Sequence, residues 1–168
     1  DELDGSAREW GAVNTIRFEG REPSGPWVPL GELGDAAPAE LRSRGFNTDA
    51  DAITRSIRED LGTEPRGATI LLLGAGGAGR TAALKLASED AKRLFLVNRT
   101  VSKAETVANE IRDRYPAVQV ETGYPDGPVD LLLNATSLGL RPTDPLPLDE
   151  SRFPAARARA VYDMIYRP

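Results

Sequence analysis

The sequence predicts an α/β fold of the Rossmann type, a doubly wound parallel sheet, preceded by a fragment of a second α/β domain at the N-terminal side. Two observations lead to this prediction. From residue 67 onward, apolar runs alternate with segments of helical periodicity, which is typical of a parallel sheet covered on both faces. The first run, residues 69–73, leads into Gly74-x-Gly76-x-x-Gly79 and then into a helix-forming segment. A dinucleotide-binding turn requires this context.

The elements expected in this part of the chain follow from the spacing of apolar residues. The second helix, for example, has Ala104, Val107, Ala108 and Ile111 on one face at helical spacing. We expect strands at 69–73, 93–97, 118–121, 129–133 and 160–165, and helices at 78–88 and 101–115.

The first 66 residues have a different character. Residues 11–18 read as a strand, residues 19–44 are rich in glycine and proline and read as a long excursion, and residues 49–58 read as a helix with Thr48 or Asp49 as its N-cap. One strand and a hairpin cannot form a core alone. Because the chain also starts at Asp1 rather than at methionine, we expect residues 1–48 to be the end of another domain.

Composition excludes several classes of function. The chain has 168 residues and a net charge of −5, which argues against non-specific nucleic-acid binding. It contains no cysteine and no histidine, so we expect no disulfide, thiolate nucleophile or metal site. No apolar run reaches the roughly 18 residues of a membrane span, and no signal-peptide pattern opens the chain. We therefore expect a cytoplasmic protein that does not bind membranes.

The glycine-rich turn has a role for each glycine. Gly74 permits the tight turn, Gly76 lets the backbone approach a pyrophosphate, and Gly79 lets the helix pack close to the strand. The pyrophosphate would lie at the helix N-terminus, where unpaired N–H groups favour an anion. A glycine turn used only for packing is the alternative. The backbone expected to hold the cofactor comprises Gly74, Ala75, Gly76, Gly77, Ala78 and Gly79.

The residues that follow the second expected strand, 93–97, indicate which dinucleotide binds. Folds that prefer NAD have a carboxylate there for the ribose 2′-hydroxyl, but this strand ends in Asn98-Arg-Thr-Val-Ser-Lys103. Arg99 and Lys103 would attract a 2′-phosphate, and Thr100 offers a hydroxyl. Alternatively, both cations are ordinary solvated charges, although a cation in a first helical turn is slightly unfavourable. NADP is therefore the expected cofactor.

The remaining motifs also follow strand ends. They are Asn134–Gly139 and Asp163–Tyr166, and in a parallel sheet they converge with the glycine turn on one crevice.

Six motifs occur in order along the chain: Gly11-Ala-Val-Asn-Thr15, Gly45-Phe-Asn-Thr-Asp49, Gly74–Gly79, Asn98-Arg-Thr100, Asn134-Ala-Thr-Ser-Leu-Gly139 and Tyr162-Asp-Met-Ile-Tyr166. This ordered set resembles the shikimate dehydrogenase family, and the resemblance covers nearly the whole chain apart from residues 19–44. Members of the family reduce 3-dehydroshikimate to shikimate with NADPH, on the route to chorismate and the aromatic amino acids.

The resemblance implies three domain parts. Residues 1–48 would be the end of the substrate-binding domain, with an insertion at 19–44. Residues 49–64 would be a linker helix. Residues 65–168 would be the NADP-binding domain, without its C-terminal segment.

The resemblance also implies roles for individual residues. Asn14 and Asp49 would bind substrate hydroxyls, Asp49 would be the partner of a catalytic lysine, and Tyr166 would contact the substrate. Asn98, Arg99, Thr100 and Lys103 would hold NADP together with the glycine turn. The nicotinamide side would be flanked by Asn134, Ala135, Thr136, Ser137 and Met164.

Each role has a plainer alternative. Asn14 could satisfy backbone groups in a turn, Asp49 could serve only as an N-cap, the Asn134 loop could be turn chemistry, and Tyr166 could be packing.

The sequence also departs from the family pattern. The family's Ser-x-Ser motif, catalytic lysine and C-terminal glutamine are missing, since the lysines present are Lys85, Lys92 and Lys103. Ala50 replaces the glycine that usually follows Asp49. We therefore expect a fragment that binds NADP but turns over poorly alone. A quinate/shikimate paralogue, a Rossmann domain of another two-domain reductase or a non-catalytic NADP-binding module are the alternatives. The partner would be a small-molecule substrate, and a homodimer is compatible with the sequence.

Overall fold

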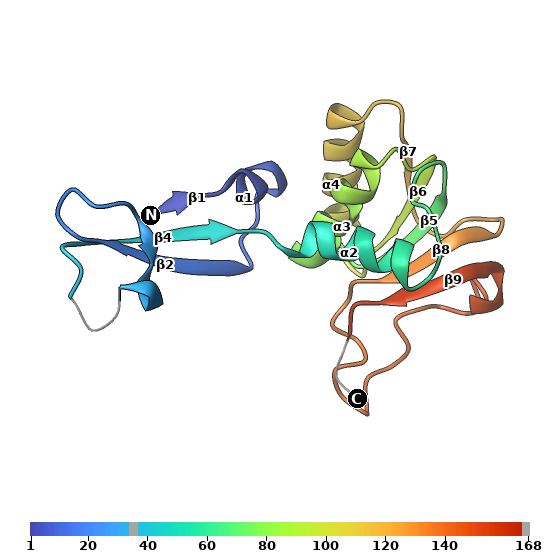
Figure 1. The fold of residues 1–168 in the computed structure, drawn as a ribbon. Helices are drawn as coiled ribbons and strands as arrows, with labels where there is room; N and C mark the ends of the chain where they lie inside the picture. The colour runs from blue at the N-terminus through green and yellow to red at the C-terminus, as the bar shows by residue number, and fades with distance from the viewer. Residues whose placement is uncertain (34–36, 166–168) are drawn as a thin grey trace. The chain divides into compact units, whose positions relative to one another are not determined.

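The computed structural model describes residues 1–33 and 37–165 (Figure 1). The chain divides into two compact units, Asp1–Asp49 and Ala50–Pro168.

The first unit is a small mixed sheet with one short helix. Its elements are β1 (Glu2–Leu3), α1 (Gly5–Trp10), β2 (Thr15–Arg21), β3 (Val28–Pro29), the 3-10 helix η1 (Leu30–Glu32) and β4 (Glu40–Phe46). The strand order is β1-β4-β2-β3, and the long β2/β4 pair is antiparallel. Asp4 caps α1 by accepting a hydrogen bond from the Ser6 N–H, and Gly11 ends it with φ +61°.

The expected excursion at 19–44 is therefore partly wrong, because β2 runs on to Arg21 and pairs with β4. Glu19 explains how so charged a segment can form a strand. It is 2% exposed and hydrogen-bonds Arg17 on its own strand and Arg42 on β4. The opposite face of the hairpin is apolar and exposed, with Ile16, Phe18 and Leu41 each more than half exposed.

The second unit contains a five-stranded parallel sheet. It comprises β5 (Thr69–Leu73), α3 (Gly77–Ser88), β6 (Arg93–Val97), α4 (Val101–Arg114), β7 (Gln119–Thr122), β8 (Val129–Asn134), the 3-10 helix η2 (Ala155–Arg157) and β9 (Ala158–Asp163). Helix α2 (Asp49–Glu59) precedes them and buries Ala50, Ile53 and Ile57. The strand order β7-β6-β5-β8-β9 is the Rossmann order, with its reversal between β5 and β8.

Both faces of this sheet are buried, but different structures cover them. Helices α3 and α4 lie together on one side of the strands (Figure 1), joined by hydrogen bonds between Arg80 and Glu110. On the other face Leu71, Leu73 and Phe95 pack against Phe153, which belongs to the segment after β8 and is fully buried. Residues 135–157 contain a single 3-10 helix, η2, so the cover on this face comes from a loop, through the buried Phe153 and the partly buried Leu148.

The strand and helix boundaries in this unit lie close to the expected ones. Strands β5 and β6 agree at both ends. β9 begins and ends two residues before the expected 160–165, because the parallel pairing with β8 ends at Asn134↔Asp163.

Candidate functional site

The glycine-rich turn links β5 to α3, and on one side it packs closely against neighbouring backbone. Gly74 has φ +102°, and a Cβ there would lie 2.8 Å from the carbonyl oxygen of Ala135. A Cβ at Gly79 would lie 2.2 Å from the carbonyl oxygen of Gly74. These two positions therefore require glycine on steric grounds, as the sequence predicted.

The other side of the turn is open. A Cβ at Gly76 or Gly77 would meet no heavy atom within 4 Å. Gly76 is the N-cap of α3, it supplies no side-chain cap, and the first turn contains no acidic residue. The N–H groups of a first helical turn have no intrahelical acceptor. The turn thus presents unpaired donors beside open space, which fits a bound pyrophosphate.

Ala75 is an exception within the turn. Its N–H donates to Asn98 Oδ1 at 3.0 Å, while Asn98 Nδ2 donates to the Thr100 carbonyl at 2.8 Å. The Asn98 amide therefore ties the glycine turn to the turn that follows β6. Asn98 and the Ala75 N–H were both predicted to hold the cofactor, and here they bond to each other.

The cations predicted to hold a 2′-phosphate lie at the end of β6. Arg99, Thr100 and Lys103 are all exposed, and α4 begins with no acidic residue in its first turn. Neither cation is in any of the ion pairs found among the described residues. Their charge is thus available to an anion beside the glycine turn.

The loop after β8 is built around one buried amide. Asn134 is 3% exposed, and its Oδ1 accepts from the Thr136 N–H at 3.0 Å and the Thr136 hydroxyl at 2.7 Å. The Thr136 hydroxyl in turn accepts from the Leu138 N–H at 3.1 Å. Both side chains are therefore directed into the loop, whereas Ser137 is exposed.

This loop adjoins the glycine turn. The Ala135 N–H donates to the Leu73 carbonyl at 2.8 Å, and the Met164 N–H donates to the Asn134 carbonyl at 3.0 Å. The structure therefore brings the predicted residues of β5, β6, β8 and β9 together at the carboxyl edge of the sheet. The crevice of a doubly wound fold lies at this edge, where the strand order reverses.

The predicted substrate residues lie near the end of the first unit. Asn14 Oδ1 accepts from the Thr48 N–H at 3.0 Å, and Asn14 Nδ2 donates to the Thr48 hydroxyl at 3.2 Å. Asp49 follows as the first residue of α2 and is half-buried. Asn14 thus lies beside the residue that precedes Asp49. Tyr166 lies outside the described residues.

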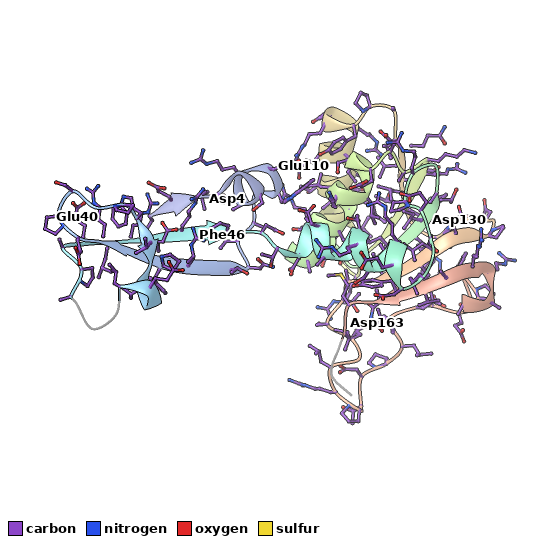
Figure 2. The ribbon with its side chains drawn as sticks, viewed as in Figure 1. Asp4, Glu40, Phe46, Glu110, Asp130 and Asp163 are labelled. Carbon is purple, nitrogen blue, oxygen red and sulfur yellow. The ribbon has the colours of Figure 1, made fainter. Side chains whose placement is uncertain are left out.

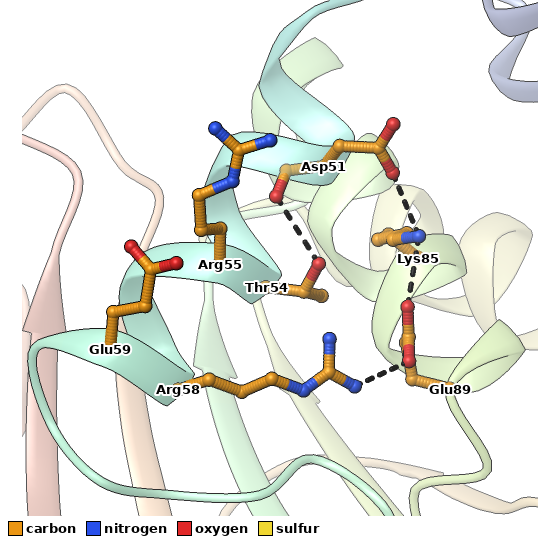
Figure 3. A pocket seen from close by; sticks show the side chains of 7 residues that line it. All are labelled: Asp51, Thr54, Arg55, Arg58, Glu59, Lys85 and Glu89. Atoms are coloured by element: carbon orange, nitrogen blue, oxygen red, sulfur yellow. Dashed lines mark hydrogen bonds and ion pairs between the residues drawn. The ribbon is translucent and has the colours of Figure 1, made fainter.

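A polar hollow between α2 and α3 is not part of this crevice (Figure 3). Lys85 Nζ lies 2.9 Å from Asp51 and 2.9 Å from Glu89, and Glu89 also binds Arg58 at 2.6 Å. Burial opposes the charged form of Lys85, but hydrogen bonds to Asp51 and Glu89 outweigh it and raise its pKa. A lysine held protonated in this way joins two helices and is unsuited to act as a base.

Known proteins resemble this chain in sequence. The sequence model of the family described as Shikimate / quinate 5-dehydrogenase matches residues 56–123. An NADP⁺ shikimate dehydrogenase of Geobacter metallireducens is 36% identical over 177 residues, covering 100% of this chain and 54% of that protein. Over its whole length the chain is similar to shikimate dehydrogenases. It spans about half the length of the curated relatives that it matches.

Solved structures show the same similarity. A shikimate dehydrogenase in complex with NADP⁺ has a TM-score of 0.71 and 30% identity, over 99% of this chain and 52% of that one. A quinate dehydrogenase from Corynebacterium glutamicum in complex with NAD has a TM-score of 0.68 and 25% identity, over 99% of this chain and 53% of that one. These two similar structures thus contain different dinucleotides. Among the described residues, no helix is long and apolar enough to cross a membrane.

Sequence reasoning missed Asp163 as part of the site. It is the last residue of β9 (Figure 2), and its carboxylate accepts a hydrogen bond from the buried Asn134 amide. The only sequence signal was an acidic residue within the expected strand 160–165, in a motif singled out for other residues.

Proposed function

We propose that this chain carries the dinucleotide-binding part, and the end of the substrate-binding part, of an NADP-dependent shikimate dehydrogenase. The observation that carries the proposal is the open glycine turn beside the exposed cations Arg99 and Lys103. A pyrophosphate and a 2′-phosphate are two anionic groups of NADP, and the chain offers a matched site for each. The reaction would be the reversible reduction of 3-dehydroshikimate to shikimate.

The nicotinamide ring, when bound, supplies or accepts the hydride. The residues of this chain orient it. The N-terminus of α3 would hold the pyrophosphate, and Arg99, Thr100 and Lys103 would hold the 2′-phosphate. Ala135, Ser137 and Met164 would line the nicotinamide side, with Asn98, Asn134 and Thr136 shaping the turns around them.

The first unit would contribute to the substrate site. Asn14 and Asp49, with Tyr166, would bind the substrate. Asp49 would also be the partner of the family's catalytic lysine, which promotes proton transfer at the carbonyl oxygen. None of the lysines in this sequence stands in the family's catalytic motif. Lys85, for example, is held between α2 and α3 by Asp51 and Glu89. We therefore expect the isolated chain to bind NADP and to turn over poorly or not at all.

Two alternatives remain distinct from this proposal. A quinate/shikimate paralogue would use the same fold, and the similarity to the NAD-bound quinate dehydrogenase supports keeping this alternative. A module that binds NADP without catalysis would need only the second unit. A single experiment that assays both shikimate and quinate distinguishes the shikimate dehydrogenase, the paralogue and the non-catalytic module.

The experiment is a chimera in which residues 1–168 replace the matching part of the Geobacter metallireducens enzyme. The relative then supplies the half of its length that this chain does not span. We expect NADP⁺ reduction that depends on shikimate, and loss of turnover on Asp49→Asn substitution with NADP⁺ affinity retained. A matched control is Asp51→Asn, two residues further along α2, which should keep turnover.

Three outcomes would contradict the proposal. Faster turnover of quinate than of shikimate would favour the paralogue. NADP⁺ binding without turnover of either substrate would favour the module. Measurable turnover by the 168-residue chain alone would refute the expectation that it is inactive by itself.

A further inference from the structure

Figure 2 labels Asp163 at the end of β9, where its carboxylate makes two hydrogen bonds. Its Oδ1 accepts from Asn134 Nδ2 at 2.9 Å and from the Ile165 N–H at 2.9 Å. These bonds join the tips of two neighbouring strands, β8 and β9, which are already in register at Asn134↔Asp163. Asp163 thus links the loop that follows β8 to the segment that follows β9.

The buried Asn134 amide donates from Nδ2 to two acceptors, Asp163 Oδ1 at 2.9 Å and the Leu138 carbonyl oxygen at 3.4 Å. A carboxylate accepts hydrogen bonds and donates none when ionised, so only the NH₂ group of Asn134 can face it. The amide oxygen is then directed to the opposite side, where it accepts from the Thr136 N–H and hydroxyl. A reversed amide would place its NH₂ group against the Thr136 N–H, where two donors would oppose each other. Asp163 thus supplies the shorter of the two hydrogen bonds that Asn134 Nδ2 donates, and with the Thr136 N–H it holds the amide in the orientation on which the loop 135–138 is built.

The strand order shows which half of the cofactor this loop would serve. The cations at the end of β6 mark the adenosine side, because they are placed to hold a 2′-phosphate. The pyrophosphate turn lies at β5, and β8 and β9 lie on the other side of β5. A dinucleotide bound across the strand-order reversal would therefore have its nicotinamide half over the loop after β8.

We propose that Asp163 is a positioning residue for the nicotinamide half of the cofactor, acting through Asn134. This inference rests on the proposed NADP site and assigns a function to a residue outside the direct contacts. Asp163 does not need to touch the cofactor, since its effect passes through the Asn134 amide to the backbone of Ala135–Ser137.

The test uses two ligands that share one half of the cofactor. Adenosine 2′,5′-bisphosphate carries the adenosine, the 2′-phosphate and one 5′-phosphate but lacks the nicotinamide half. Calorimetric titration of Asp163→Ala should show NADP⁺ affinity reduced about tenfold, the effect of losing one hydrogen bond to a charged group. Affinity for the bisphosphate should stay within about twofold of the unsubstituted chain.

Two variants complete the design. Asp163→Asn keeps an acceptor for Asn134 Nδ2, so it should restore NADP⁺ affinity to within about threefold. Asp113→Ala on α4 removes the same charge from an exposed position away from the crevice and should bind both ligands normally. Equal weakening of both ligands in Asp163→Ala would overturn the proposal, as would unchanged NADP⁺ affinity.

Amide hydrogen exchange of the ligand-free chain separates this inference from the proposed function. Asp163→Ala should accelerate exchange at Thr136 and Leu138 about tenfold. Exchange at Ala75, whose N–H donates to Asn98 after β6 on the other side of β5, should stay unchanged. Failure of the unsubstituted chain to bind NADP⁺ would overturn the proposed function. Unchanged exchange at Thr136 would overturn the positioning role of Asp163 whatever the binding result.

Discussion

At the scale of single residues, the glycines of the β5–α3 turn fall into two kinds. Gly74 and Gly79 are required by the protein's own backbone, because a Cβ at either would overlap a carbonyl oxygen. Gly76 and Gly77 face open space, so nothing within the described protein requires them to lack a side chain. The first pair therefore serves folding, and the second pair leaves room for a ligand.

This difference predicts opposite effects of two similar substitutions. Gly79→Ala should destabilise the second unit by about 1–3 kcal/mol, because the helix must move away from β5. Gly76→Ala should leave stability within about 1 kcal/mol, since its φ of −78° and ψ of −169° suit any residue. It should nevertheless weaken NADP⁺ binding at least about tenfold, because its methyl group would occupy the pyrophosphate space.

Urea unfolding followed by far-UV circular dichroism measures these stabilities. Tryptophan fluorescence would not, since Trp10 and Trp27 both lie in the first unit. A Gly76→Ala variant that binds NADP⁺ normally would show that the open side of the turn is not the pyrophosphate site.

At the scale of elements, the parallel strands were predictable, whereas of the charged strands only the first part of β2, within the expected strand 11–18, was. β5, β6 and β8 are buried on both faces, so their sequences are continuous apolar runs that are readily recognised. β2 and β4 alternate arginine and glutamate with apolar residues, and they become strands because Glu19 pairs with Arg42 across the sheet. Such pairing depends on a partner 23 residues away, which no local pattern indicates.

Local sequence patterns likewise did not predict which residues cover the second face of the parallel sheet, or which side chains of the site face a ligand. Phe153 was not predicted to be a core residue, because a single aromatic residue in a loop has no periodicity. The motifs identified which strand ends form the crevice. They did not distinguish side chains that face a ligand, such as Arg99, from those that hold a turn, such as Asn98. That distinction lies in the hydrogen bonds of the Asn98 amide.

The contact between α3 and α4 predicts a dependence of stability on pH. Burial opposes ionisation of Glu110, but hydrogen bonds and charge from Arg80, then from Arg114, outweigh it and lower its pKa. The unfolded chain therefore binds this proton more readily than the folded one. The stability contributed by Glu110 is present above its ordinary pKa near 4.5 and is lost as pH falls below it.

Glu110→Gln should consequently cost about 0.5–1 kcal/mol at pH 7 and less at pH 3. The measurement is urea unfolding by circular dichroism at both pH values, with the exposed Glu105→Gln on the same helix as the control. A cost that grows on acidification would contradict the sign derived from the lowered pKa.

At the scale of the whole molecule, the functions divide between the two units. The second unit contains every group assigned to the dinucleotide, from the glycine turn to Asp163. The first unit contains Asn14, and Asp49 stands at the boundary where α2 begins. Because the chain spans about half the length of its relatives, cofactor binding is the part of the proposed function that this chain can be expected to perform alone.

The most direct test of this account is calorimetric titration of the chain with NADP⁺ and with NAD⁺, repeated on the Arg99→Ala/Lys103→Ala double variant. Two hydrogen bonds to a charged phosphate predict that NADP⁺ binds tens to thousands of times more tightly than NAD⁺. The double variant should lose this preference while its NAD⁺ affinity stays within about twofold. Equal affinity for the two cofactors, or an equal loss of both in the double variant, would contradict the 2′-phosphate site and with it the proposed NADP-dependent function.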